Sequence, residues 1–238
     1  MLTRRHLRIK VMQSLYSFLL NREGNLVKEV KFFKNSYLNT FSLYLTLLAF
    51  LKSIHEYSKN QINLQKELRS KTDKPNLGKL VQNKILSFIA EHPLLIQHIK
   101  KRKIKFWELN FDYIKTNFKV LLESQKFQAY TQIEYPSLED DRSIIAFFFK
   151  EIVAPSDDFY DYIEDIELTW VDDLPVVNTF LLKILNKIDP SDSNSLYFPE
   201  MNTGDEDPKF AIELLEKVVA NNDLLQKEME GRTPNWDS

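Results

Sequence analysis

The first 22 residues read MLTRRHLRIKVMQSLYSFLLNR, and they predict one amphipathic helix around which the rest of the chain is organised. Thr3 is a suitable N-cap, because its hydroxyl can accept a hydrogen bond from a free N–H group of the first turn. Gly24 suits the left-handed position that ends many helices. The predicted core-facing stripe consists of Leu7, Val11, Leu15 and Phe18, widened by Met12 and Leu19.

The charge of this helix is unusual for its position. Its N-terminal half is crowded with the basic side chains Arg4, Arg5, His6, Arg8 and Lys10, and the first acid comes only after the helix. A helix N-terminus already carries partial positive charge, so each cation there costs roughly a few tenths of a kcal/mol. Guanidinium groups match phosphate oxygens and release counterions, so the pattern indicates a phosphate-contacting helix. The alternative is an N-terminus whose cations are simply solvated.

The composition bounds the class of protein. A chain of 238 residues can bury a substantial core, and its net charge of −2 leaves any nucleic-acid binding to local clusters. The absence of cysteine excludes disulfides and thiol chemistry and fits a reducing cytoplasm. No apolar run approaches the ~20 residues of a membrane span, and the first helix lacks a cleavage site, so no membrane association is expected.

The remaining chain also reads as helices. It has four glycines and no convincing strand alternation, so the predicted class is all-α, an irregular multi-helix bundle. The apolar run 43–51 should make its helix central, and Ser137 with Asp140 predicts a capping box. The predicted helices are 26–37, 38–70, 80–91, 94–99, 107–132, 137–153, 157–166, 174–188, 209–220 and 224–230, with a linker over 70–78 and a loop over 189–207.

Charge changes sign along the chain. A second basic cluster at 100–105 precedes Phe106 and Trp107, an arrangement that can hold single-stranded nucleic acid by charge and stacking. The alternative is a solvated turn followed by the first core residues of the next helix. Acids outnumber bases over 134–173, a region that would repel phosphate and suit a basic partner.

Enzymatic motifs are missing from the sequence. No glycine-rich phosphate loop occurs, and none of the four histidines stands in an HExxH or Glu-x-x-His pattern. The acidic clusters lack the spacing and the glycine of a calcium-binding loop. We therefore expect no catalysis, no cofactor and no metal.

Two stretches resemble a known family. The segment 4–18, RRHLRIKVMQSLYSF, is similar to the opening helix of the bacterial transcription antitermination factor NusB, an arginine-rich motif that runs into an apolar core segment. The segment 210–225, followed by GRTPNWD at 231–237, resembles a later helix of the first NusB subdomain and the turn after it. On this resemblance, 1–22 and 208–238 are portions of the N-terminal subdomain. Residues 25–207 are then a large helical insertion, as in long Bacteroidetes forms.

The resemblance implies a function and a set of residues. The family is all-helical and binds boxA RNA together with the ribosomal protein NusE, which modifies elongation by RNA polymerase. Position by position, the arginine-rich motif falls on Arg4, Arg5, His6 and Arg8, with Lys10 one turn beyond. Tyr16 matches a family tyrosine near the RNA-binding face.

The chain departs from the family at its end. The second subdomain has no counterpart before Asp237-Ser238, and these are residue types that start helices. A chain cut short there would leave an apolar face uncovered, which invites a homodimer or another partner. Two other interpretations stay open: a helical protein-interaction scaffold that docks a partner through 134–173, and a regulatory bundle with a ligand cavity among its aromatic side chains.

Overall fold

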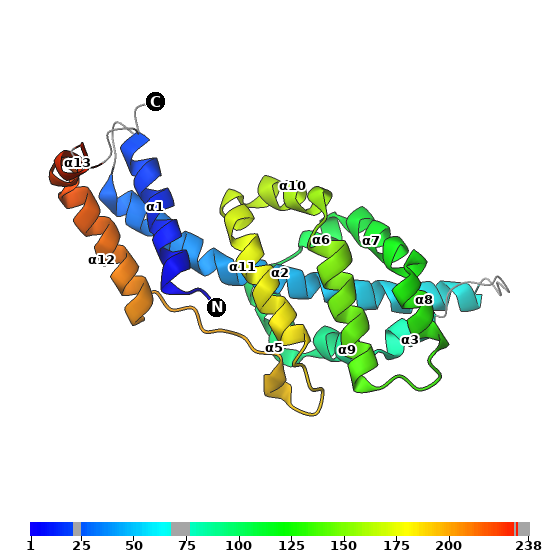
Figure 1. Cartoon of the computed structure of the whole chain (residues 1–238). Coiled ribbons are helices and arrows are strands. Elements are labelled where there is room, and N and C mark those ends of the chain that lie inside the picture. Colours follow the sequence, from blue (N-terminus) through cyan, green and yellow to red (C-terminus); the bar gives the residue numbers. More distant parts are fainter. Residues whose placement is uncertain (21–24, 68–76, 231, 233–238) are drawn as a thin grey trace. The chain divides into compact units, whose positions relative to one another are not determined.

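The computed structural model describes residues 1–20, 25–67, 77–230 and 232, and within these ranges it contains thirteen α-helices and no strand (Figure 1). The all-α class is thus confirmed. The chain forms two compact units, Met1–Phe41 with Glu200–Ser238 (unit 1) and Ser42–Pro199 (unit 2). The predicted cap at Gly24, most of the 70–78 linker and the turn at 231–237 lie outside the described residues.

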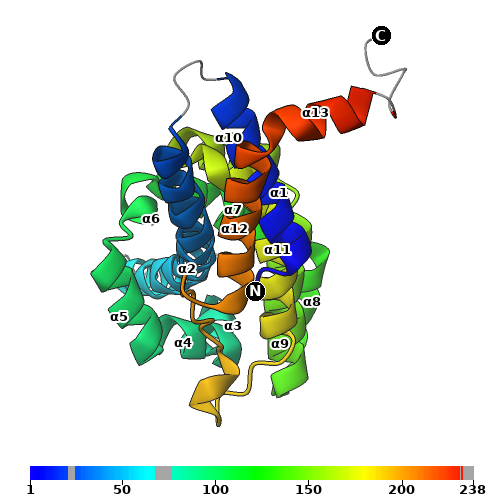
Figure 2. The ribbon, with the colours of Figure 1, turned by 90° about the vertical axis from the view of Figure 1, so that its left-hand side faces the viewer.

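Unit 1 is a helical bundle built from both ends of the chain. It contains α1 (Arg4–Leu20), the first part of α2 (Leu26–Glu67), α12 (Glu206–Ala220) and α13 (Asn222–Glu230). Helices α1 and α12 pack side by side although about 200 residues separate them (Figure 2). The buried core consists of Leu7, Val11, Phe33, Tyr37, Ala211 and Leu215. Residues 25–41, assigned above to the insertion, therefore lie in unit 1, because Phe33 and Tyr37 complete its core.

The prediction of two helices over 26–70 is wrong, because Leu26–Glu67 form the single helix α2. It runs without interruption, since no glycine or proline occurs between Leu26 and Glu67. The Thr40 hydroxyl donates to the Ser36 carbonyl oxygen at 3.2 Å, so this polar side chain is satisfied inside the helix. Among the described residues, α2 is the one helix long and apolar enough to cross a membrane, and 72% of its most apolar window is buried, as in a core helix.

Unit 2 surrounds the second part of α2. The apolar run 43–51 is central, as predicted. Its residues Tyr44, Leu47, Phe50 and Leu51 have no exposed surface. Around it lie α3 (Leu77–Gln82), α4 (Lys84–Glu91), α5 (Pro93–Arg102), α6 (Phe106–Leu109), α7 (Phe111–Glu123), α8 (Gln125–Gln132), α9 (Leu138–Phe147), α10 (Asp157–Ile166) and α11 (Leu168–Leu185). A π-helical turn η1 (Phe148–Val153) extends α9, and a short 3-10 turn η2 (Ser193–Ser195) lies in the loop before α12.

Internal N-caps divide two helices that were predicted to be continuous. Buried Asn83 separates α3 from α4 by accepting a hydrogen bond from the Leu86 N–H at 2.9 Å. The segment 107–132 is three helices, with breaks at Asn110 and at Ser124, whose hydroxyl accepts from the Phe127 N–H. A side chain that competes for backbone N–H groups thus outweighs continuous apolar periodicity.

The other helix starts give mixed outcomes. The capping box is confirmed: Ser137 N–H donates to Asp140 Oδ2 at 2.9 Å, and Asp140 N–H donates to Ser137 Oγ at 3.1 Å. The predicted start of a helix at 174 is wrong, because α11 begins at Leu168. Asp173 is therefore buried inside this helix, and Pro175 lies within it.

Asn83 joins three helices, and its loss should cost more than the loss of a simple cap. Its Nδ2 donates to the Tyr130 hydroxyl at 3.2 Å and to the Asp141 carbonyl at 3.1 Å. We expect Asn83→Ala to lower the free energy of unfolding by about 2–4 kcal/mol, combining a lost cap with buried groups left unpaired. Urea unfolding measures the change. Ser156→Ala, which removes the N-cap of α10, is the control at about 1 kcal/mol; equal losses would contradict the joining role.

Acid should destabilise unit 2 through His55. Burial, the largest influence, lowers the pKa of His55, and Lys59 lowers it further, while the Val81 carbonyl and Glu91 oppose these effects. The unfolded chain takes up the proton first, so the stability contributed by neutral His55 is present above about pH 6.5 and is lost as the pH falls towards the lowered value. Unfolding free energies from about pH 7.5 to about pH 5 should decline less steeply in His55→Gln; parallel profiles would count against this role.

Candidate nucleic-acid interface

The first turn of α1 is closed by its own histidine. Thr3 precedes the helix as predicted, and its carbonyl accepts from the Leu7 N–H at 3.1 Å. The Thr3 N–H donates to His6 Nδ1 at 3.1 Å, and the Thr3 hydroxyl lies 2.9 Å from the same nitrogen. His6 thus fills the place of the glutamate in a capping box. This hydrogen bond ties one ring nitrogen of His6 to the start of the helix.

Arg4 is tied to α12. Its Nε donates to Asp207 Oδ1 at 2.6 Å, and this hydrogen bond raises the pKa of the Arg4 guanidinium. The same guanidinium lies 5.4 Å from the centroid of the Phe210 ring, within cation–π range. Asp207 in turn suits the first turn of α12, where an acid is favourable. Arg4 therefore helps to attach α1 to α12, and its charge is largely offset.

Arg5 and Arg8 are exposed and directed to solvent. The Arg8 guanidinium lies 5.9 Å from the centroid of the Phe210 ring, which supports the side chain without neutralising it. Arg5 makes no ion pair or side-chain hydrogen bond with the described residues. These two guanidinium groups are accordingly available to an anionic ligand.

Lys10 does not belong to this surface. Its side chain is 4% exposed, and its Nζ donates to Ser36 Oγ of α2 at 2.7 Å. It shares the core side of α1 with Leu7, Val11 and Ser14. The prediction that Lys10 contacts RNA is corrected: this cation is buried within unit 1 and reaches α2 through its apolar stem.

Tyr16 lies on the opposite side of α1 and is 66% exposed. Met12 and Leu19, predicted to widen the core stripe, are also on this side, with 65% and 56% exposure. That part of the prediction is wrong, because Lys10 and Ser14 occupy the buried positions instead. We call the exposed set the outer stripe; it consists of Ile9, Met12, Tyr16, Leu19 and Leu20.

The outer stripe gives α1 two apolar faces. Positions 9, 12, 16 and 20 lie about half a turn around the helix from positions 7, 11, 14 and 18, given about 3.6 residues per turn. Arg5 continues the outer stripe one turn towards the N-terminus. The spacing was visible in the sequence, but an apolar residue at helical spacing does not say which of two faces is buried.

The second basic cluster, in unit 2, has no aromatic platform beside it. Trp107 is buried and its Nε1 donates to the Thr46 carbonyl at 2.7 Å. Phe106 packs edge-on against Trp107, with ring centroids 4.7 Å apart. Trp107 is thus a core residue, as in the alternative interpretation, and Phe106 is half-buried against it. The exposed cations Lys100, Lys101 and Arg102 lie in the last turn of α5, where they favourably complement the helix dipole.

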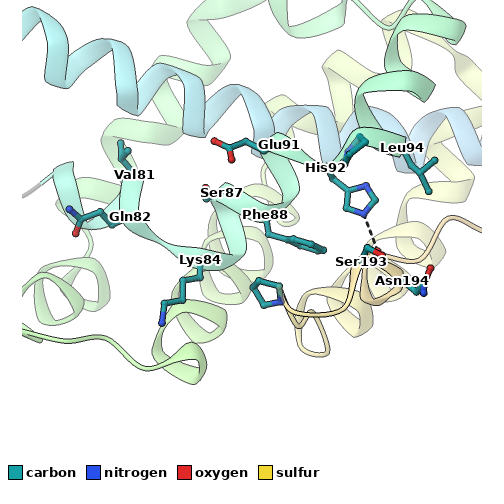
Figure 3. A pocket seen from close by; sticks show the side chains of 12 residues that line it. Val81, Gln82, Lys84, Ser87, Phe88, Glu91, His92, Leu94, Ser193 and Asn194 are labelled. Atoms are coloured by element: carbon teal, nitrogen blue, oxygen red, sulfur yellow. Dashed lines mark hydrogen bonds between the residues drawn. The ribbon is translucent and has the colours of Figure 1, made fainter.

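Unit 2 also has a surface cavity of about 620 Å³ between α3, α4, the start of α5 and the loop at 190–194 (Figure 3). Its one histidine, His92, donates from Nε2 to the Ser193 carbonyl at 3.0 Å and packs against Phe88. The other ring nitrogen is buried without a hydrogen-bond partner among the described residues, so it does not face the cavity. His92 thus holds the loop in place. No group of three or more His, Asp or Glu that could hold a metal occurs in the described ranges.

Comparisons with known proteins add no relative. A scan against protein-family models finds no match to the chain, and neither do searches among curated proteins and among solved structures.

The contrasting positions of Lys10 and Arg5 predict contrasting effects on stability. Lys10→Ala removes a packed stem and leaves the Ser36 hydroxyl without its donor, so it should lower the unfolding free energy by about 2 kcal/mol. Arg5→Ala should change it by no more than about 0.5 kcal/mol. Denaturant unfolding of both variants measures this. A stable Lys10→Ala protein would mean that Lys10 is free for a ligand after all.

Proposed function

We propose that this chain is a NusB-like RNA-binding factor that acts in transcription antitermination, contacting boxA-type RNA together with NusE to modify RNA polymerase elongation in the cytoplasm. One observation carries the proposal: α1 directs Arg5, Arg8 and Tyr16 to solvent while its opposite face holds the core of unit 1. Contacts within unit 1 therefore occupy only some of the basic side chains of the arginine-rich segment.

The chemistry of this surface suits a single strand. Arg5 and Arg8 bind phosphate oxygens, and no acid within α1 opposes them. Tyr16 lies three turns further along, about 16 Å from Arg5, and offers a ring on which a base can stack. Arg4 and His6 act indirectly, by fixing the start of the helix. Two cations and one ring supply affinity rather than sequence readout, so part of the boxA specificity comes from NusE.

Salt titration of RNA binding tests the proposal. Fluorescein-labelled single-stranded boxA RNA is titrated with the chain, with and without NusE, at several salt concentrations. In Arg5→Ala/Arg8→Ala the slope of log K against log salt should flatten by about 1.4, which is about 0.7 for each lost phosphate contact on a single strand. Tyr16→Leu should weaken binding by about 1–3 kcal/mol with an unchanged slope, and Tyr16→Phe should largely restore it.

Arg4→Ala is the matched control, because this arginine is already paired with Asp207. Arg4→Ala should change the slope of log K against log salt by clearly less than about 0.7, the change expected for one lost phosphate contact. An unchanged affinity and slope in Arg5→Ala/Arg8→Ala would exclude α1 as the RNA-binding element.

A further inference from the structure

The outer stripe of α1 is an apolar surface that unit 1 itself does not use. Its five side chains are between 41% and 66% exposed, and they follow one another at spacings of three, four, three and one residues. From Ile9 to Leu20 the stripe is about 16 Å long, or three helical turns. The largest apolar patch on a protein surface is often functional, and this row suits a surface for a partner.

The size of the stripe argues for a small partner element. Five half-exposed side chains amount to an apolar patch on the order of 500 Å². A stable homodimer usually buries about 800 Å² on each partner. A single helix laid along α1 matches both the length and the width of the stripe.

The charges around the outer stripe indicate which charges the partner helix carries. Arg5 extends the row at its N-terminal end and Arg8 borders it, while α1 itself contains no acid. A second copy of α1 would bring only further cations and no carboxylate. The acidic helix α10 of a second copy does not fit either, because its apolar residues Phe159 and Ile163 are already buried in unit 2.

We infer that the outer stripe is the docking site for an amphipathic helix of a partner protein, with apolar side chains along Ile9 to Leu20 and carboxylates at the end beside Arg5 and Arg8. The partner helix covers the apolar row in the helix-in-groove manner, and its carboxylates fix the direction in which it lies. This inference concerns a protein ligand and goes beyond the proposed RNA binding, although both ligands would meet at Arg5 and Arg8.

Synthetic helices of about 18 residues test the inference. The first peptide has leucines along one face and glutamates clustered at one end; the second has lysines in place of the glutamates; the third has serines in place of the leucines. Each is labelled and titrated with the full chain by fluorescence anisotropy. We expect the first to bind with a Kd on the order of 10–100 μM. The other two should bind at least about tenfold more weakly.

Variants locate the site. Met12→Ser/Leu19→Ser should weaken binding of the acidic peptide about tenfold, since two contacting side chains lose their apolar surface. Val27→Ser/Leu224→Ser is the matched control, because these residues of unit 1 are at least as exposed as Met12 and Leu19, respectively, but lie outside α1. Circular dichroism melts establish that both variants fold. Arg5→Glu/Arg8→Glu should reverse the preference, so that the lysine peptide binds better.

Several results would overturn the inference. These are equal binding of the acidic and basic peptides, loss of binding in the control rather than in Met12→Ser/Leu19→Ser, or a sedimentation-detected dimer that Met12→Ser/Leu19→Ser dissolves. A fourth is loss of RNA binding in Met12→Ser/Leu19→Ser with no peptide binding, which would make the stripe part of an RNA surface. Failure of RNA binding alone leaves the inference intact, because the peptide assay contains no RNA.

Discussion

The contact on which unit 1 depends is that of Leu7 and Val11 with the apolar side chains of α2 and α12. It fixes the rotation of α1 about its own axis, and this rotation decides which basic side chains reach solvent. Lys10 turns inward with the core, whereas Arg5 and Arg8 turn outward. The packing of α1 thus determines which of its charged side chains are exposed.

The basic side chains of the arginine-rich segment have different partners. Arg4 forms an ion pair with Asp207, His6 accepts a hydrogen bond in the first turn, and Lys10 donates to Ser36 inside the bundle. A cation placed against the helix dipole is tolerated when a carboxylate or hydroxyl of a neighbouring helix compensates it. The two remaining arginines have no such compensation within the described residues, so their charges stay exposed to solvent and to any anion in it.

Much of the fold could be predicted from periodicity, including the all-α class, the central place of residues 43–51 and the capping box at Ser137. The errors have two physical sources. Asn83 and Ser124 start new helices within continuous apolar patterns, because their side chains compete locally for backbone N–H groups. In α1, apolar residues fit two faces, so the pattern alone could not decide whether Met12 or Lys10 is buried; only the neighbouring helices decide it.

The construction of unit 1 from both chain ends has a consequence for synthesis on the ribosome. Helix α1 leaves the ribosome before its partner α12, which follows only after about 200 further residues. Until then Leu7 and Val11 have only α2 to pack against, while unit 2, whose residues are contiguous, can already close its core. Long-range contacts of this kind form late because loop closure must precede them. The arginine-bearing surface thus becomes ordered only after α12 has been made.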